Sequence, residues 1–240
     1  MKKMGLTFIY LWLISLCSCQ KELIEYKKGD VKIRIEQGEQ WLHDFPLFLG
    51  INKKNPPQIA IWLEDTQGDY LSTVYVTHKI ATQSWQASGG NRRKEALPHW
   101  CYSRGVKYDD GLYLPTKKEP LIDGISGATP QESFDIKLNP ATALKKFVVK
   151  IEINHSTDFN EAFPKSAKDG EANYSGGKEG SGQPAIVYAA NVDLSSGEKS
   201  FEANLVGHSS PNGSSGEVSK DTSGLTTALH IVKRITVIIQ

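Results

Sequence analysis

The sequence predicts an all-β protein, an immunoglobulin-like β-sandwich of about eight strands joined by long loops. Two observations predict this class. Apolar and polar residues alternate in many short segments, as they do in strands that bury one face. No segment has the longer apolar periodicity of an amphipathic helix. The single helix-like stretch, residues 141–146, amounts to about one turn.

The alternation is cleanest in residues 147–154, where Phe147 and Ile151 share one side and Lys150 and Glu152 the other. This pattern predicts a strand that is buried on one face only. Residues 59–63 and 231–239 are more continuously apolar, which is typical of strands packed on both faces. The remaining predicted strands are residues 31–36, 70–76, 134–138, 185–192 and 201–205.

The connections between strands are of two kinds. Residues 64–69 form a short acidic stretch with one glycine between two strands, which predicts a tight hairpin. A calcium loop would need more oxygen ligands at fixed spacing. Residues 165–183 and 208–224 are rich in Gly and Ser, a composition that predicts long mobile loops.

The N-terminus has the pattern of a signal peptide. Two lysines precede an apolar stretch that is too short to span a bilayer. The end of this stretch, Leu16-Cys17-Ser18-Cys19, resembles the lipobox of bacterial lipoproteins. The small Ser18 side chain favours cleavage before Cys19 rather than before Cys17, so the resemblance implies acylation of Cys19. The alternative is an ordinary secretory signal with two incidental cysteines.

This resemblance implies a location in the cell envelope, on the outer membrane because Gln20 rather than aspartate follows the anchor. The acyl chains would then be the only membrane attachment. The expected divisions of the chain are a signal peptide at 1–18, the lipidated Cys19 with a polar tether at 19–30, and one β-sandwich domain at 31–240.

The balance of charges excludes nucleic-acid binding as a function. Lys plus Arg is 28 against 27 for Asp plus Glu, so the chain lacks the positive charge that drives nucleic-acid binding.

Once Cys17 is removed and Cys19 acylated, Cys101 has no disulfide partner. A buried, small apolar side chain is the expected role for Cys101, and a reactive thiol is the alternative.

Classical hydrolase and metal motifs are absent from the sequence. There is neither an HExxH spacing nor a GxSxG elbow, so we expect no catalytic residue of these kinds. His155 and Asp158 lie three residues apart and would share a cation only if this segment leaves its strand in a turn. A surface histidine beside a turn is the simpler reading, and no metal is expected.

Residues 123–129 read Asp-Gly-Ile-Ser-Gly-Ala-Thr and are predicted to form a turn. This motif resembles the flavinylation motif of the FMN-binding subunits of sodium-pumping quinone reductases. In that family a flavin transferase attaches FMN to the last threonine through a phosphodiester. The resemblance implies Thr129 as the acceptor, Asp123 as a metal-binding or orienting carboxylate, and Ser126 and Gly127 as the small residues that enter the transferase.

The residues after the motif depart from that family. Pro130 and Gln131 follow Thr129, where the family has a further hydroxyl residue. Residues 129–132 read Thr-Pro-Gln-Glu, which is the pattern of a helix capping box with proline in the first turn. The alternative to flavinylation is therefore a structural turn in which Thr129 caps one helical turn.

A second resemblance covers most of the chain after the signal peptide. It is similar to the periplasmic family called domain of unknown function 2271, through blocks at residues 57–65, 96–100, 126–130, 152–156, 182–189 and 221–228. The family implies an envelope location and the company of flavin transferases and membrane reductases of the PepSY type. It implies no established activity.

These observations lead to two expectations about function. The first is a non-enzymatic envelope lipoprotein that serves an extracytoplasmic redox or metal-reduction system, as a covalent FMN carrier through Thr129. The second is a β-sandwich that binds a small ligand or a partner protein without a cofactor, using loops such as residues 85–100. A carrier needs an exposed motif, whereas a binding module needs an exposed binding surface.

Overall fold

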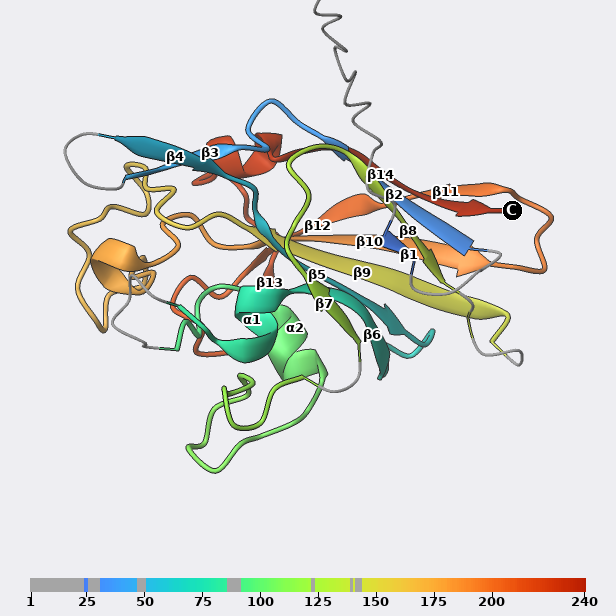
Figure 1. Ribbon diagram of the computed structural model, residues 1–240, viewed down its shortest axis with the longest axis horizontal. Helices are drawn as coiled ribbons and strands as arrows, with labels where there is room; N and C mark the ends of the chain where they lie inside the picture. The colour runs from blue at the N-terminus through green and yellow to red at the C-terminus, as the bar shows by residue number, and fades with distance from the viewer. Residues whose placement is uncertain are drawn as a thin grey trace, which may run out of the picture.

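The chain forms a sandwich of two β-sheets, so the predicted all-β class is confirmed (Figure 1). The computed structural model describes residues 24–25, 31–46, 51–85, 92–121, 124–138, 140 and 144–240. The five-stranded sheet lies above the seven-stranded sheet in this view, and two short helices lie below the latter. A separate two-stranded hairpin extends from one end.

The two sheets draw their strands from distant parts of the chain. In spatial order the five-stranded sheet consists of β1 (Ile24–Glu25), β8 (Phe134–Leu138), β2 (Val31–Gln37), β14 (Val232–Ile239) and β11 (Ser200–Glu202). The seven-stranded sheet consists of β13 (Val218–Ser219), β12 (Asn204–Ser209), β10 (Ile186–Asp193), β9 (Lys146–Asn154), β5 (Gln58–Glu64), β6 (Tyr70–Thr77) and β7 (Ile125–Gly127). All pairs are antiparallel except β1 with β8 and β6 with β7.

The remaining elements are short. The separate hairpin is formed by β3 (His43–Pro46) and β4 (Asn52–Asn55). Two helices, α1 (His78–Thr82) and α2 (Pro98–Ser103), lie against the seven-stranded sheet on the side away from the five-stranded sheet (Figure 1). Two single turns of 3-10 helix, η1 (Gly177–Glu179) and η2 (Thr227–His230), occur in the connections.

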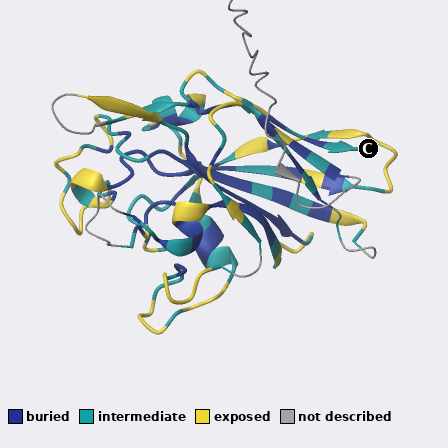
Figure 2. Ribbon diagram, in the orientation of Figure 1, coloured by how far each residue is buried: buried dark blue, intermediate teal, exposed yellow. Residues whose placement is uncertain are grey.

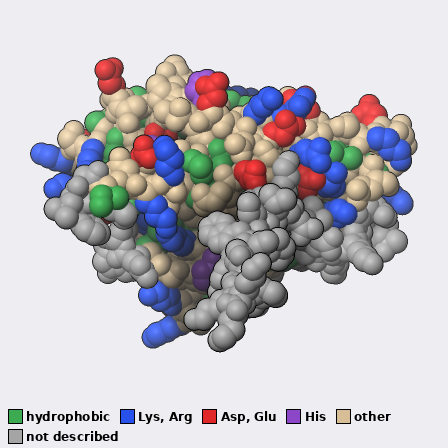
Figure 3. Space-filling view, turned by 45° about the horizontal axis from the view of Figure 1, so that its top comes forward, with side chains coloured by type: hydrophobic (Ala, Val, Ile, Leu, Met, Phe, Trp, Pro, Cys, Tyr) green, Lys and Arg blue, Asp and Glu red, His purple; other side chains and the backbone are tan. Residues whose placement is uncertain are grey.

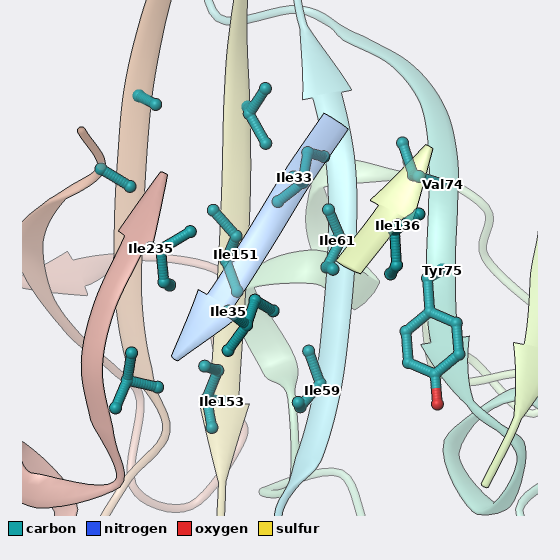
Figure 4. Packing of buried hydrophobic residues seen from close by; sticks show 14 of the residues in the cluster. Ile33, Ile35, Ile59, Ile61, Val74, Tyr75, Ile136, Ile151, Ile153 and Ile235 are labelled. Carbon is teal, nitrogen blue, oxygen red and sulfur yellow. The ribbon is translucent and has the colours of Figure 1, made fainter. Parts of the chain in front are cut away.

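The main core lies between the sheets. Ile33 and Ile35 of β2 are fully buried, while Arg34 between them is exposed, because successive side chains of a strand point to opposite faces. Figure 4 shows these two side chains lying across Ile61 of β5 and Ile151 of β9. The alternation read from the sequence therefore identifies the inward face of each sheet.

The outer face of the seven-stranded sheet is also covered. Trp62 of β5 is fully buried in a second cluster with Trp100 of α2, and every residue of β5 is buried (Figure 2). The prediction that residues 59–63 pack on both faces is confirmed. For residues 147–154 the prediction of a single buried face is wrong, because Glu152 lies beneath α2 and is fully buried.

One predicted strand is in fact two. Residues 201–205 divide into β11 and β12, because the chain passes from one sheet to the other at Ala203. The Ala203 N–H donates to the Ile235 carbonyl (3.0 Å), and β12 then pairs with β10. Residues 144–145 are not helical and Lys146 begins β9, while residues 141–143 of the predicted helical turn lie outside the described residues.

The predicted hairpin at residues 64–69 is confirmed, whereas the two predicted mobile loops differ from expectation. The Asp65 N–H donates to the Asp69 carbonyl (2.9 Å), and Gly68 has a φ of 92°, which favours glycine. In the Gly- and Ser-rich stretches, Ser181 is fully buried and the Ser214 carbonyl accepts from Tyr102 (2.8 Å). Both stretches therefore make specific hydrogen bonds, buried at Ser181 and exposed at Ser214, which composition alone does not indicate.

The signal peptide, Cys19 and most of the predicted tether lie outside the described residues. Within the tether, however, β1 adds to the five-stranded sheet by pairing in parallel with β8. No described helix has the length and apolar character needed to cross a membrane.

We expect Ile151→Ala to lower the free energy of unfolding by about 2–5 kcal/mol, because it leaves a cavity between the sheets. Leu205→Ala is the matched control, since Leu205 is 41% exposed, and should change stability by about 0.5 kcal/mol or less. Urea unfolding followed by tryptophan fluorescence measures both. Equal losses for the two variants would contradict the assigned core.

Candidate functional site

The middle of the motif, residues 125–127, forms a strand rather than the predicted turn. Residues 125–127 make up β7, which pairs in parallel with β6 at the edge of the seven-stranded sheet. Gly124 must be small here, since a Cβ atom would lie 2.8 Å from Cγ2 of Thr73. Packing against β6 therefore accounts for part of the motif, and Asp123 lies outside the described residues.

Thr129 is buried and already has a hydrogen-bond partner. It is 5% exposed, and its Oγ1 lies 2.8 Å from Oγ1 of Thr77. Thr77 in turn accepts from the Ile59 N–H (2.9 Å), so the Thr129 hydroxyl belongs to a buried network on the sheet. The residues that follow it are not helical, so the prediction that Thr129 caps a helical turn is wrong.

Two aromatic side chains hold the carbonyls on either side of Thr129. The Tyr75 hydroxyl donates to the Gly127 carbonyl (3.2 Å), and Nε1 of Trp41 donates to the Pro130 carbonyl (3.1 Å). Burial raises the pKa of Tyr75 to about 12, so this hydroxyl stays protonated and remains a donor at neutral pH.

The motif as folded does not fit attachment of FMN at Thr129. Ser126 and Ala128 are exposed, but the acceptor oxygen lies beneath them against Thr77. A transferase needs that oxygen free and within reach, which would require β7 to leave β6. The geometry therefore favours a structural role for the Thr129 hydroxyl.

His155 and Asp158 have separate partners. A ring nitrogen of His155, Nε2, donates to the Gln40 carbonyl (2.8 Å), and Asp158 accepts from the Thr227 hydroxyl (2.6 Å). Burial lowers the pKa of His155 to about 3, so the ring is neutral at physiological pH. No group of three or more metal-ligating side chains occurs in the described ranges.

Cys101 is buried, and the basic residues Arg92 and Arg93 are both paired with carboxylates. Cys101 is 2% exposed, and burial raises the pKa of its thiol, as expected for a small apolar side chain. Arg93 pairs with Glu95 (2.8 Å) while both side chains are 5% exposed, and Arg92 pairs with Asp110. Acidic and basic side chains are intermixed on the face shown in Figure 3.

The Arg93 guanidinium connects three segments of the chain. Besides Glu95 it donates to the hydroxyls of Ser156 (2.6 Å) and Ser181 (3.0 Å), and it lies over the Trp85 ring (4.6 Å from the centroid). A buried charge is stable only when it is paired and hydrogen-bonded. This network fixes the Gly- and Ser-rich stretch before β10 against the segment that precedes α2.

A polar cluster that sequence reasoning missed lies between α2 and β9. Glu152 accepts from the backbone N–H groups of His99 (3.2 Å) and Trp100 (2.8 Å), so a side chain from the sheet caps the helix. Leu97, at the N-cap position, supplies no side-chain hydrogen bond. Desolvation by burial raises the pKa of Glu152 from 4.5 to about 7 despite these donors.

Charged groups and a histidine surround this carboxyl group. The next outward-facing residue of β9, Lys150, pairs with Glu64 of β5 (3.6 Å). The His99 ring lies edge-on to Trp62, with centroids 5.4 Å apart, and its Nδ1 lies 2.7 Å from the Gly216 carbonyl. Burial lowers the pKa of His99 to about 4. The sequence signal that could have identified this cluster is the pair of charged residues Lys150 and Glu152, at alternate positions of the apolar strand β9.

We expect Glu152→Gln to change how stability depends on pH. The folded pKa of Glu152 lies above the unfolded value, so the folded state holds more protons between pH 4.5 and about 7 and loses stability as pH rises through that window. Relative to Glu152→Gln, the wild type should lose on the order of 2–3 kcal/mol between pH 5 and 8. Urea unfolding at each pH measures this. The exposed Glu202→Gln should run parallel to wild type, and parallel curves for Glu152→Gln would contradict the assignment.

Comparison with known proteins adds no relative on which to base an assignment. No family model matches the chain, and no curated protein or solved structure matches it either. The resemblances in the sequence, to lipoproteins, to flavinylated subunits and to domain of unknown function 2271, therefore remain predictions.

Proposed function

We propose that this chain is a non-enzymatic lipoprotein of the bacterial cell envelope whose β-sandwich binds a ligand or partner protein. Its anchor is the acylated Cys19, and by resemblance it serves an extracytoplasmic redox or metal-reduction system. The lipobox ending at Cys19 supports the proposed location in the cell envelope. The sandwich supports the role, because folds of this class commonly present binding surfaces on a rigid scaffold.

The burial of Thr129 is the observation that favours binding over covalent carriage. A flavin carrier must present its acceptor hydroxyl to a transferase, whereas this hydroxyl is 5% exposed and 2.8 Å from Thr77. The small residues of the motif have a packing reason, since Gly124 lies against Thr73. A structural strand accounts for these observations without a cofactor.

A covalent FMN carrier is the second candidate. Two observations favour it: the complete match at residues 123–129, and the exposure of Ser126 and Ala128 on an edge strand. Partners in this case would be a flavin transferase and a membrane reductase. Attachment would require residues 124–130 to separate from β6 before the Thr129 oxygen could react.

Intact mass decides between the two candidates. The chain from Gln20 to Gln240 is exported to a periplasm with and without a flavin transferase from a host that carries this protein. We expect the same mass in both cases, because the Thr129 hydroxyl is buried. A gain of one FMN phosphodiester that depends on the transferase and disappears in Thr129→Ala, but persists in the control Thr116→Ala, would establish a carrier instead.

Acylation provides a separate test of the proposed location in the cell envelope. We expect the full chain, expressed in a Gram-negative host, to incorporate labelled palmitate and to fractionate with membranes. Cys19→Ser should abolish both, because the acyl chains are the predicted attachment. Cys17→Ser is the matched control and should leave labelling unchanged. Labelling that survives Cys19→Ser would contradict the assigned anchor.

A further inference from the structure

The β3–β4 hairpin presents an exposed apolar side chain beside two exposed lysines. Ile51 is 55% exposed, the highest value among the large apolar side chains of the described residues. Lys53 and Lys54 follow it and are exposed as well. The residues that connect the two strands read Leu-Phe-Leu-Gly but lie outside the described ranges, so the site is defined by Ile51, Lys53 and Lys54. An apolar side chain next to lysines is typical of segments that bind at the surface of a membrane.

The charge around these residues is positive. Asp44 is the one acidic residue in β3 and β4, and it pairs with Lys54 (3.0 Å) where both side chains are exposed, so the pair is weak. A third lysine, Lys79 of α1, lies nearby: burial lowers its pKa, and the charges of Lys53 and Arg93 lower it further. Three lysines against one aspartate attract anionic phosphate groups.

The predicted anchor reaches the end of the sandwich from which the hairpin projects. Ile24, the first residue of β1, lies level with Ile33 of β2, and the two strands run in opposite directions, so the N-terminal end of β1 points toward Gln37. The chain passes from Gln37 into the hairpin (Figure 1). Gln37 lies four residues beyond Ile33, about 13 Å along the strand. Five residue steps separate Cys19 from Ile24, a reach of about 18 Å at most.

This short connection holds the hairpin beside the bilayer. An acylated Cys19 lies at the membrane surface, so contact of the hairpin with lipid becomes an intramolecular event with a high effective concentration. Even a weak attraction then decides how the sandwich is oriented, because each basic residue near an anionic surface favours the contact about fivefold. An acidic protein would also attract the lysines, but only the bilayer is kept at this end of the sandwich by the same chain.

We propose that the β3–β4 hairpin is a second membrane contact, in which Ile51 enters the bilayer interface while Lys53 and Lys54 bind the phosphate groups of anionic lipids. The contact depends on the acylated Cys19 of the proposed function and adds a fixed orientation to it. Residues 104–121, on the other side of the seven-stranded sheet, then face away from the bilayer (Figure 1).

Fluorescence from two labelled positions tests this orientation. The full chain is purified with its acyl chains from a Gram-negative host and incorporated into vesicles of phosphatidylethanolamine and phosphatidylglycerol. An environment-sensitive fluorophore is attached at Ile51→Cys or, as the matched control, at Val106→Cys, where the native side chain is 43% exposed. Cys101 is 2% exposed and should not react. We expect a blue shift and quenching by spin-labelled lipid at position 51, and neither at position 106.

Lysine variants test the contribution of charge. Lys53→Gln combined with Lys54→Gln should lower the equilibrium constant for hairpin contact about thirtyfold, which corresponds to about 1 kcal/mol for each lysine. Lys117→Gln combined with Lys118→Gln is the matched control, because these adjacent lysines are also exposed but follow α2. This control should leave quenching at position 51 unchanged, and vesicles of phosphatidylcholine alone should reduce it.

Two results would overturn the proposal. One is a label at position 51 that is shielded no more than the label at position 106, and the other is unchanged contact after loss of both Lys53 and Lys54 charges. All substituted side chains are exposed, so each variant should fold as the wild type does, which circular dichroism verifies. A purified chain without acyl groups would instead refute the proposed location itself, and palmitate labelling of the same preparation records that failure separately.

Discussion

The structure depends on two central strands, β5 and β9, that are covered on both faces. Strands β5 and β9 have one face in the main core and the other beneath residues 92–121, so their outward polar groups cannot reach bulk water freely. A buried charge there needs a partner. Glu152 finds one in the covering layer, because it caps α2, whereas Glu64 finds its partners on the sheet itself, since it accepts from Trp62 (2.8 Å) and pairs with Lys150. The contact of Glu152 with α2 acts together with the apolar packing of Trp100 in holding the covering layer on the sheet.

The motif at residues 123–129 shows how packing can produce a sequence that resembles a modification signal. Small residues let β7 lie close to β6, and the threonine places its hydroxyl on a neighbouring threonine of the sheet. The same residues therefore have two explanations: a modification signal, from the resemblance to flavinylated subunits, and a packing role, from the geometry. Access to one oxygen atom separates the two explanations, and in the folded chain that oxygen faces Thr77.

Local patterns in the sequence predicted the strands well, because alternation follows directly from the pleat. The limits of β8 were predicted to the residue, and those of β2 and β5 to within one residue at each end. Partners distant in sequence could not be predicted. Glu152 appeared solvent-facing because the helix that covers it is distant in sequence: Trp100 lies 52 residues before Glu152. The Gly- and Ser-rich stretches appeared mobile because their partners lie elsewhere in the chain: Arg93 binds Ser181 of the first, and Tyr102 binds the Ser214 carbonyl of the second.

The pairing of β2 with β14 has a consequence for how the chain acquires its structure. These strands lie side by side in the middle of one sheet, with Ile35 opposite Ile235, although they come from nearly opposite ends of the described chain. Contacts of such large sequence separation form late and make folding slow. Under the proposed export, the chain cannot complete this sheet until residues 232–239 have crossed the membrane, so the five-stranded sheet would remain open during the passage.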